Sequence, residues 1–450
     1  MLIASVTHLE DLDKVGSLAD GIELRLDSFD DLTQVKKPPR PTIFTFRKKE
    51  QGGVRDIAEA ERLAQIEKLL ELGPEYCDIE ADTDPMFIAR IAKKYPAVKL
   101  IGSYHNFQET PRDLPALLQS MYNPHFSVYK IAVTAQSTPD MLRLMIFAKG
   151  AQVPLSAISM GEYGKPSRVL GPIVGNVFDY AGLKEDEELH RYSLETLHEL
   201  FHYRRLNPQT TIYGLIGNPV AQSLSDRFHN PRFKHNAVYV KMRLAPGEIP
   251  EFFSLLRQLP FGGLSVTMPL KEVVLSQMDE IEQVARSIGA VNTVIVRDGK
   301  CIGANTDGAG ALNALEKRAT VRGKRIALLG AGGSARAIAY MAMQRGAKVS
   351  IYNRTLERAQ RLAAEFHCTG HKLDALGDYD ILINTIPTAA GHLPKVAPRA
   401  VVMDIVTRPR ETPLLAVAKA MGSPCVYGEE MFIEQGLLQQ AEWFHSIRAL

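Results

Sequence analysis

Short apolar runs recur along the first 200 or so residues, separated by stretches whose apolar positions have helical spacing. The clearest helices are expected over Asp56–Leu72 and Pro139–Lys149. Eight such β/α units in about 200 residues predict a (β/α)8 barrel. The expected strands are Leu2–Val6, Ile22–Asp27, Thr42–Arg47, Tyr76–Glu80, Lys99–His105, Val128–Val133, Leu155–Met160 and Pro172–Phe178.

The polar segment Y-R-R-L-N-P-Q-T-T, over Tyr203–Thr211, follows this region. Its Asn-Pro pair is typical of a turn, and we place a domain boundary there. A second β/α series begins with Ile212–Gly217, and a third segment opens with K-R-I-A-L-L-G-A-G-G-S-A over Lys324–Ala335. A last helix is expected over Glu434–Leu450. The fold class is therefore α/β throughout.

Composition indicates a globular chain with more than one core, because 450 residues exceed a single ordinary domain. The formal net charge of +2 does not indicate a nucleic-acid partner, which would favour a strongly basic chain. The cysteines are too scattered for a disulfide framework or a zinc site. Neither a cleavable leader nor an apolar run that spans a bilayer is evident, and we expect a complete cytoplasmic protein without membrane partners. The oligomeric state is left open.

Charged residues interrupt three of the predicted barrel strands, although such strands are usually continuous apolar runs. Strand two, I-E-L-R-L-D, places Glu23, Arg25 and Asp27 on one face. Strand three ends at Arg47, and Lys130 stands in the middle of V-Y-K-I-A-V. A charge buried there without a partner costs several kcal/mol. These positions are therefore candidates for chemistry.

Each of these residues also has a structural interpretation. Glu23 and Arg25 would form an ion pair, and Lys130 would lie on an edge strand, which fits less well because a closed barrel has no edge. Alternatively, desolvation lowers the pKa of a buried lysine, and its amine becomes a nucleophile that forms a Schiff base with a ketone. His105 ends strand five, at the rim where barrel active sites lie, which favours an acid/base role.

The motifs I-E-L-R, T-F-R…G-G, S-Y-H-N-F, Y-K-I-A and S-M-G…S-R occur in this order over about residues 1–200. This set resembles type I 3-dehydroquinate dehydratase. The resemblance implies that Lys130 forms an imine with the substrate ketone and that His105 shuttles protons while water is lost. It also implies that the substrate hydroxyls and carboxylate are held by Glu23, Arg25, Arg47 and Arg168, with Ser5 as a further binding residue.

Two positions depart from that family. Gln51 stands where the family usually has glutamate before Gly-Gly, and Y-A-G-L-K-E-D, around Tyr180–Asp186, replaces a closing loop that usually carries Pro-Gly-Gln and a serine. One alternative is therefore a catalytically silent barrel that serves as a binding module. The retention of Lys130 and His105, with the arginines above, argues against it.

A glycine-rich turn follows the strand that begins at Lys324. Its residues Gly330, Ala331, Gly332, Gly333 and Ser334, followed by Ala335, fit the dinucleotide pattern G-x-G-x-x-G/A. Glycines there let the backbone approach a pyrophosphate at a helix N-terminus.

The next strand, Lys348–Tyr352, ends in Asn353, Arg354 and Thr355, with Arg358 one helical turn on. An NAD enzyme usually places Asp or Glu there for the ribose hydroxyls, whereas arginine suits a 2′-phosphate. The alternative is a pair of solvated surface arginines. We expect NADP as the cofactor and no metal.

Polar motifs precede the dinucleotide segment: G-L-I-G-N-P-V-A-Q-S-L-S over Gly214–Ser225, L-S-V-T-M-P-L-K over Leu264–Lys271, A-V-N-T over Ala290–Thr293 and N-T-D-G over Asn305–Gly308. Singly, each reads as a turn or a helix cap. Together they offer hydroxyls, an amide, an ammonium and a carboxylate, which suit a polyhydroxylated acid. This set resembles shikimate dehydrogenase, over about residues 211–450.

The second resemblance implies that Lys271 and Asp307 are the catalytic pair. Ser223 and Ser225 would bind the substrate carboxylate. The other implied contacts are Thr267, Asn292 and Gln435 for the substrate and Gly428 near the nicotinamide. The implied domains are a barrel at 1–206, a substrate domain at 211–309, an NADP-binding Rossmann domain at 310–433, and a helix at 434–450 that returns to the substrate domain.

Together the resemblances imply consecutive reactions of the shikimate pathway of aromatic amino-acid biosynthesis: 3-dehydroquinate to 3-dehydroshikimate, then NADPH-dependent reduction to shikimate. The second family usually has histidine, proline and tyrosine where this chain has Gln222, Asp226 and Thr407. A quinate or quinate/shikimate dehydrogenase is therefore the alternative for the second half.

Overall fold

The computed structural model describes residues 1–187, 190–386 and 396–444. By the packing of the backbone, the chain forms two compact units. The first comprises Met1–Ile212 and Asn230–Phe261, and the second comprises Tyr213–His229 and Gly262–Leu450.

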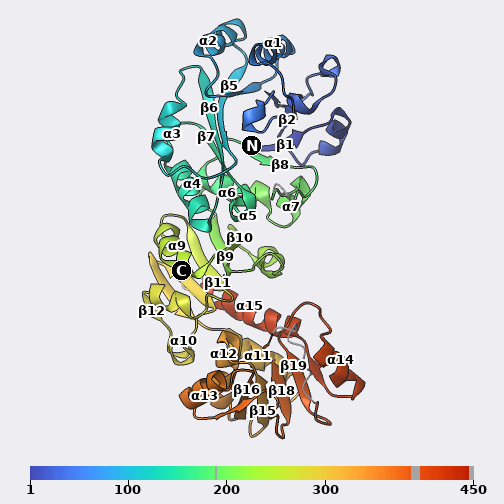
Figure 1. The fold of residues 1–450 in the computed structure, drawn as a ribbon, viewed down its shortest axis with the longest axis vertical. Helices are drawn as coiled ribbons and strands as arrows, with labels where there is room; N and C mark the ends of the chain where they lie inside the picture. The colour runs from blue at the N-terminus through green and yellow to red at the C-terminus, as the bar shows by residue number, and fades with distance from the viewer. Residues whose placement is uncertain (188–189, 387–395, 445–450) are drawn as a thin grey trace. The chain divides into compact units, whose positions relative to one another are not determined.

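Eight parallel strands form the barrel of the first unit, in the order β7-β6-β5-β4-β3-β2-β1-β8 (Figure 1). Seven of the predicted strands are confirmed, with ends that shift by up to two residues. The strands are β1 (Leu2–Val6), β2 (Gly21–Arg25), β3 (Thr42–Thr45), β4 (Tyr76–Glu80), β5 (Lys99–Asn106), β6 (Phe126–Thr134), β7 (Leu155–Met160) and β8 (Asp179–Ala181).

The eighth predicted strand, Pro172–Phe178, is wrong. Its first residues, 172–174, lie in the helix α6 (Ser167–Val174), which ends at Gly175 with a left-handed φ of 85°. The strand β8 follows it, pairs with β1 and is only three residues long. The segment before β8 reaches β7 through one backbone bond, from Val177 N to Leu155 O at 3.0 Å. Side chains complete the contact: the amide of Asn176 bonds both backbone groups of Ala157, and Ser156 Oγ accepts from the backbone N of Phe178.

Helices alternate with the strands, as the sequence predicts. The clearest is α4 (Thr138–Gly150), where Ser137 accepts from the backbone N of Asp140 and Pro139 occupies the first turn. The others are α1 (Glu59–Leu70), α2 (Pro85–Lys94), α3 (Leu114–Ser120), α5 (Gly161–Gly164) and α7 (Leu194–Glu199). The first unit also contains β10 (Ala237–Arg243) and α9 (Ile249–Leu256), and α9 packs against α4.

In the second unit, β9 (Thr211–Gly217), β11 (Phe261–Val266), β13 (Thr293–Arg297), β14 (Lys300–Ala304) and β12 (Glu280–Ile281) follow one another in a mixed sheet. The hairpin between β13 and β14 turns at Asp298 and Gly299, which both have positive φ, as a two-residue turn of this kind requires. Short helices α8 (Ser225–His229) and α10 (Gln283–Ile288) lie in the same unit.

A parallel sheet of order β17-β16-β15-β18-β19-β20 completes the second unit. Its strands are β15 (Arg325–Leu329), β16 (Lys348–Asn353), β17 (Thr369–Lys372), β18 (Ile381–Asn384), β19 (Val401–Asp404) and β20 (Cys425–Val426). The helices beside it are α11 (Asp307–Glu316), α12 (Gly333–Gln344), α13 (Leu356–Glu365), α14 (Pro413–Ala420) and α15 (Gly428–Phe444). The sheet order is the doubly wound one expected for a Rossmann domain.

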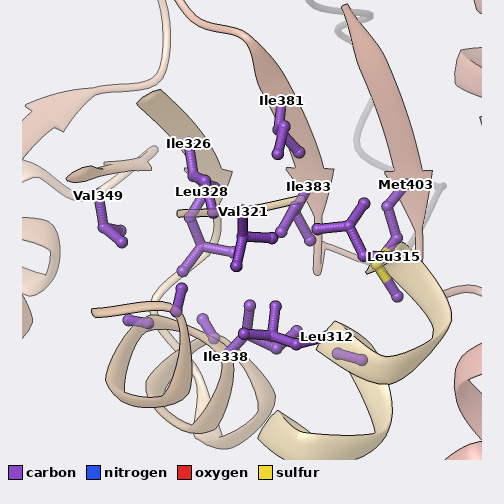
Figure 2. Close-up of a cluster of buried hydrophobic side chains, with 14 of the residues drawn as sticks. Leu312, Leu315, Val321, Ile326, Leu328, Ile338, Val349, Ile381, Ile383 and Met403 are labelled. Carbon is purple, nitrogen blue, oxygen red and sulfur yellow. The ribbon is translucent and has the colours of Figure 1, made fainter. Parts of the chain in front are cut away.

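Apolar side chains of the central strands pack against α11 and α12 (Figure 2). Leu328, Ile383 and Met403 come from three neighbouring strands and meet Leu315 and Ile338 of the two helices. This core fixes where β15 ends and α12 begins, which is the position of the glycine-rich turn.

The predicted last helix begins earlier than expected, at Gly428, and its predicted residues 445–450 lie outside the described part of the chain. Among the described residues, no helix has the length and apolar character needed to cross a membrane. In the same residues, no group of three or more His, Cys, Asp or Glu side chains is arranged to hold a metal ion.

Candidate active sites

Lys130 projects from β6 into the barrel, and its side chain is almost fully buried. Its Nζ lies 3.0 Å from Asp78 Oδ2 and 3.3 Å from Glu23 Oε1. The ring of Tyr180 stands 4.0 Å from the same nitrogen. The ammonium is therefore paired with carboxylates and covered by an aromatic face, which offsets the cost of burying it.

Glu23 and Arg25 do not form the ion pair that was the structural interpretation of the strand pattern. Arg25 makes a two-pronged contact to Asp27, at 3.0 Å and 2.9 Å. Glu23 instead accepts from Ser5 Oγ at 2.7 Å and Thr45 Oγ1 at 3.0 Å, besides its contact with Lys130. Ser5 thus bonds the carboxylate that contacts the amine of Lys130.

Arg47, two residues after the end of β3, supplies the second buried cation. Its guanidinium contacts Asp78 at 2.8 Å, Glu80 at 3.1 Å and Ser103 Oγ at 2.6 Å. Burial acts to raise the pKa of Asp78, but Arg47 and Lys130 outweigh it and lower that pKa. Asp78 is therefore a charged link between the two cations.

His105 lies at the end of β5, beside Gln51. The amide oxygen of Gln51 accepts from the His105 backbone N at 3.1 Å and lies 3.4 Å from Nδ1. Because an amide oxygen only accepts, this contact places the ring proton on Nδ1 and leaves Nε2 with its lone pair. Burial, with the cations of Arg47 and Lys130, lowers the pKa of His105 well below its ordinary value. The neutral form of His105, which a base requires, is therefore favoured.

We expect Gln51→Glu to raise the pKa of His105, because a carboxylate beside Nδ1 favours the imidazolium. A base must be unprotonated, so barrel activity falls as pH drops through the pKa of His105. The acidic limb of the kcat/KM profile should therefore move to higher pH by about one unit. Glu50→Gln, on the exposed neighbouring side chain, is the control. An acidic limb that stays in place in Gln51→Glu would contradict this role of Gln51.

Arg168, in the first turn of α6, has a buried Nε without a hydrogen-bond partner. Desolvation, with the nearby cation of Arg191, lowers the pKa of Arg168 to about 10. Within the part of the chain that the structure describes, no acidic side chain lies within ion-pair distance of Arg168. The side chain is therefore available to an anion at the barrel.

A second cluster surrounds Lys271 and Asp307 in the second unit. Lys271 Nζ donates to Asp307 Oδ2 and, at 3.1 Å, to Ser334 Oγ of the glycine-rich turn. The amide of Asn292 donates to the other oxygen of Asp307 at 2.8 Å, and it lies 3.4 Å from Gln435 Oε1. The carboxylate, which is 4% exposed, is thus held from two sides. The structure brings these predicted residues together.

Ser223 and Ser225 contact one another through their hydroxyls at 2.8 Å, just before and at the start of α8. Thr267 lies beside the end of β9, where a Cβ on Gly217 would come within 2.2 Å of its methyl group. Gly428 opens α15 against the chain after β19, where a Cβ would meet the backbone oxygen of Val406 at 2.4 Å. A glycine is therefore required at position 428 for this close approach.

The glycine-rich turn joins β15 to α12. Gly330 has a φ of 111°, and a Cβ there would come within 2.2 Å of Thr385 Oγ1. A Cβ on Gly332 would meet nothing within 4 Å, so the backbone before α12 is open to a ligand. Asn353 caps the following turn by donating to Thr355 O at 3.0 Å, and Arg354 and Arg358 are exposed.

Comparison with known proteins covers both units. The family model for type I 3-dehydroquinase matches residues 4–208, and models for the substrate-binding domain of shikimate dehydrogenase and for shikimate/quinate 5-dehydrogenase match residues 215–294 and 313–417. A shikimate biosynthesis protein AroDE of Chlamydia pneumoniae is 36% identical, over 95% of this chain and 90% of its own. The chain belongs to the family of bifunctional 3-dehydroquinate dehydratase/shikimate dehydrogenases.

Further relatives match the whole chain or its second half. The chloroplastic bifunctional 3-dehydroquinate dehydratase/shikimate dehydrogenase of Arabidopsis thaliana is 36% identical, over 96% of this chain and 78% of its own. A shikimate dehydrogenase (NADP(+)) of Syntrophobacter fumaroxidans is 38% identical, over 52% of this chain and 87% of its own.

Sequence reasoning missed two polar residues of the bifunctional enzyme's barrel. Asp78 is a charged residue inside the apolar strand run Y-C-D-I-E. The argument applied to strand two would therefore have identified it. Tyr180 was noted only as part of the altered loop, although its ring faces Lys130 and its buried hydroxyl has no hydrogen-bond partner.

Proposed function

We propose that the barrel dehydrates 3-dehydroquinate to 3-dehydroshikimate through an imine on Lys130. The observation that carries this proposal is the buried amine between Glu23 and Asp78. The charge of Lys130 also acts on His105, at the end of the neighbouring strand β5. The amine condenses with the ketone and releases water. The resulting iminium acidifies the neighbouring C–H bond, so a base can remove that proton and the β-hydroxyl can leave as water. Water then hydrolyses the product iminium, which releases 3-dehydroshikimate and restores the amine of Lys130.

His105 is the base, and it returns the proton to the leaving hydroxyl. Its low pKa keeps Nε2 unprotonated until it takes the substrate proton. Glu23, Ser5 and Arg47 hold hydroxyls of the substrate around the amine. Arg168, with its buried and unsatisfied Nε, holds the carboxylate.

We further propose that the second unit reduces 3-dehydroshikimate to shikimate with NADPH. The open backbone at Gly332 and the start of α12 suit a pyrophosphate, and Arg354 with Arg358 suits a 2′-phosphate. NADPH, when bound, supplies the hydride. Lys271 holds or transfers the proton on the reacting oxygen, and Asp307 orients the amine. Ser223, Ser225, Thr267, Asn292 and Gln435 are proposed to bind the substrate, with Gly428 beside the nicotinamide.

A coupled assay tests the two proposals together. The full chain with 3-dehydroquinate and NADPH should consume NADPH, and shikimate should accumulate. Formation of 3-dehydroshikimate without consumption of NADPH would overturn the dehydrogenase assignment. Failure to convert 3-dehydroquinate would overturn the barrel assignment. Oxidation of quinate at a rate similar to that of shikimate would favour the quinate/shikimate alternative. The domain limits given above and a cytoplasmic location stay predictions.

NADPH should be preferred over NADH by at least about tenfold in kcat/KM, or roughly 1.4 kcal/mol, because the two arginines make charge-assisted contacts with the 2′-phosphate. The double variant Arg354→Ala/Arg358→Ala should lose most of this preference by raising KM for NADPH alone. Arg361→Ala, on an exposed residue of the same helix α13, should keep it. Equal kcat/KM values for the two cofactors in the unsubstituted enzyme would refute the 2′-phosphate site.

A further inference from the structure

The loop after β8 brings a second arginine, Arg191, to the start of α6: the ring of the adjacent Tyr192 lies 4.5 Å from Lys165 Nζ, three residues before Arg168. Arg191 follows β8 in the loop of residues 182–193, whose residues 188 and 189 are outside the described part of the chain. Its Nε, like that of Arg168, is buried and without a hydrogen-bond partner. The nearest acid to Arg191 is Asp186, whose Oδ2 stands 3.7 Å from Nη2. Both arginines therefore have unused donors.

The backbone holds Arg191 in this position. Arg191 and Asp186 exchange backbone hydrogen bonds at 2.9 Å and 3.0 Å. Gly182 N donates to Tyr192 O, and Leu194 N donates to Gly182 O. A Cβ on Gly182 would come within 3.1 Å of Arg191 Nε, so the guanidinium lies directly over the end of β8. The absence of a side chain at Gly182 makes room for it.

Charged residues of the barrel act on Arg191. Desolvation lowers the pKa of Arg191, with an opposing effect from Asp186 and Glu23 and a further lowering by Arg25. Arg191 in turn lowers the pKa of Arg168. The two guanidinium groups repel each other, and each has an Nε–H without a partner. An anion bound between them would accept from both groups and offset this repulsion.

We infer that Arg191 and Arg168 together bind the carboxylate of the barrel's substrate, so that Arg191 is a specificity-determining residue for a carboxylated ketone. This inference rests on the proposed dehydratase function. The loop that carries Arg191 replaces one that usually holds Pro-Gly-Gln and a serine. In this chain the same loop carries a guanidinium that lies over the end of β8.

The test compares full-length Arg191→Ala and Arg191→Lys with the unsubstituted enzyme, using 3-dehydroquinate. Arg191→Ala should raise KM at least tenfold and change kcat less than threefold, because a carboxylate contact acts on binding. Arg191→Lys should recover part of the loss, and millimolar guanidinium, matched in ionic strength with NaCl, should lower KM only in Arg191→Ala. Lys184→Ala, an exposed lysine of the same loop, should change KM less than twofold.

Two readouts show that the variants are folded. Shikimate oxidation with NADP reports on the second unit, and borohydride trapping on Lys130 at saturating substrate reports on the barrel. An active enzyme whose KM is unchanged by Arg191→Ala overturns this inference alone. Loss of trapping at saturating substrate also overturns it, since Arg191 would then be structural. An unsubstituted enzyme that does not dehydrate overturns both this inference and the barrel's proposed function.

Discussion

Replacing Lys130 with alanine is expected to abolish the dehydration of 3-dehydroquinate, a loss of roughly 10⁴-fold or more in kcat, because no other group at the site can form the imine. Borohydride added to the unsubstituted enzyme with its substrate should reduce the imine to a stable amine. Mass spectrometry should then find the added mass on the peptide that contains Lys130. The variant should show no such adduct, and its reduction of 3-dehydroshikimate should be almost unchanged.

Alanine at position 130 also leaves Glu23 and Asp78 without their shared cation, which costs stability. Lys130→Arg separates this effect from the chemistry, because it keeps the charge but forms no imine. Both variants should be inactive in dehydration, and Lys130→Arg should have the smaller loss of Tm. Lys93→Ala, at an exposed lysine, is the control. Dehydration at a normal rate by either Lys130 variant would rule out the imine mechanism and reopen the silent-barrel alternative.

The second large effect is expected at Lys271. Lys271→Met should lower kcat for shikimate oxidation by on the order of 10³-fold, because the reacting oxygen loses its proton donor and acceptor. Asp307→Asn should lower it less, since the amide still contacts Lys271 but no longer balances its charge. KM for NADP should stay within about threefold in both variants, because neither residue forms the 2′-phosphate site.

The barrel serves as the internal control for these variants. Dehydration of 3-dehydroquinate should proceed at the unsubstituted rate, and with NADPH present 3-dehydroshikimate should accumulate. Lys324→Met, an exposed lysine before β15, provides the matched substitution. Shikimate oxidation by Lys271→Met within tenfold of the unsubstituted rate would show that another group handles the proton.

Most strand positions followed from the sequence because β1 to β7 are apolar runs bounded by turns. The failure at Pro172–Phe178 has a physical reason: a short apolar run is compatible with a buried strand or a buried helix, and Pro172 is tolerated inside α6. The helix ends at Gly175, whose left-handed φ is a stop signal that could have been read from the sequence.

The partners of the charged residues were much less predictable. Alternation along β2 placed Glu23 and Arg25 on one face, yet Glu23 pairs with Lys130, which is 107 residues away, and Arg25 pairs with Asp27. Within a barrel, the inward side chains of several strands share one layer, and the sequence of one strand does not reveal which neighbours fill it. The same reasoning explains why Asp78 was missed.

The sequence by itself determined which chemical groups this protein carries: a lysine inside an apolar strand, a histidine at a strand end, a glycine-rich turn before a helix, and polar motifs that contain Lys271 and Asp307. These features are local, because periodicity and turn residues act over a few positions. The tertiary structure alone decided which polar groups interact. Lys130 lies between Glu23 and Asp78, Gln51 contacts His105, and the charge of Arg191 acts on Arg168. Such contacts join residues far apart in the chain, and Coulomb forces inside a protein depend on those distances and on burial rather than on sequence order.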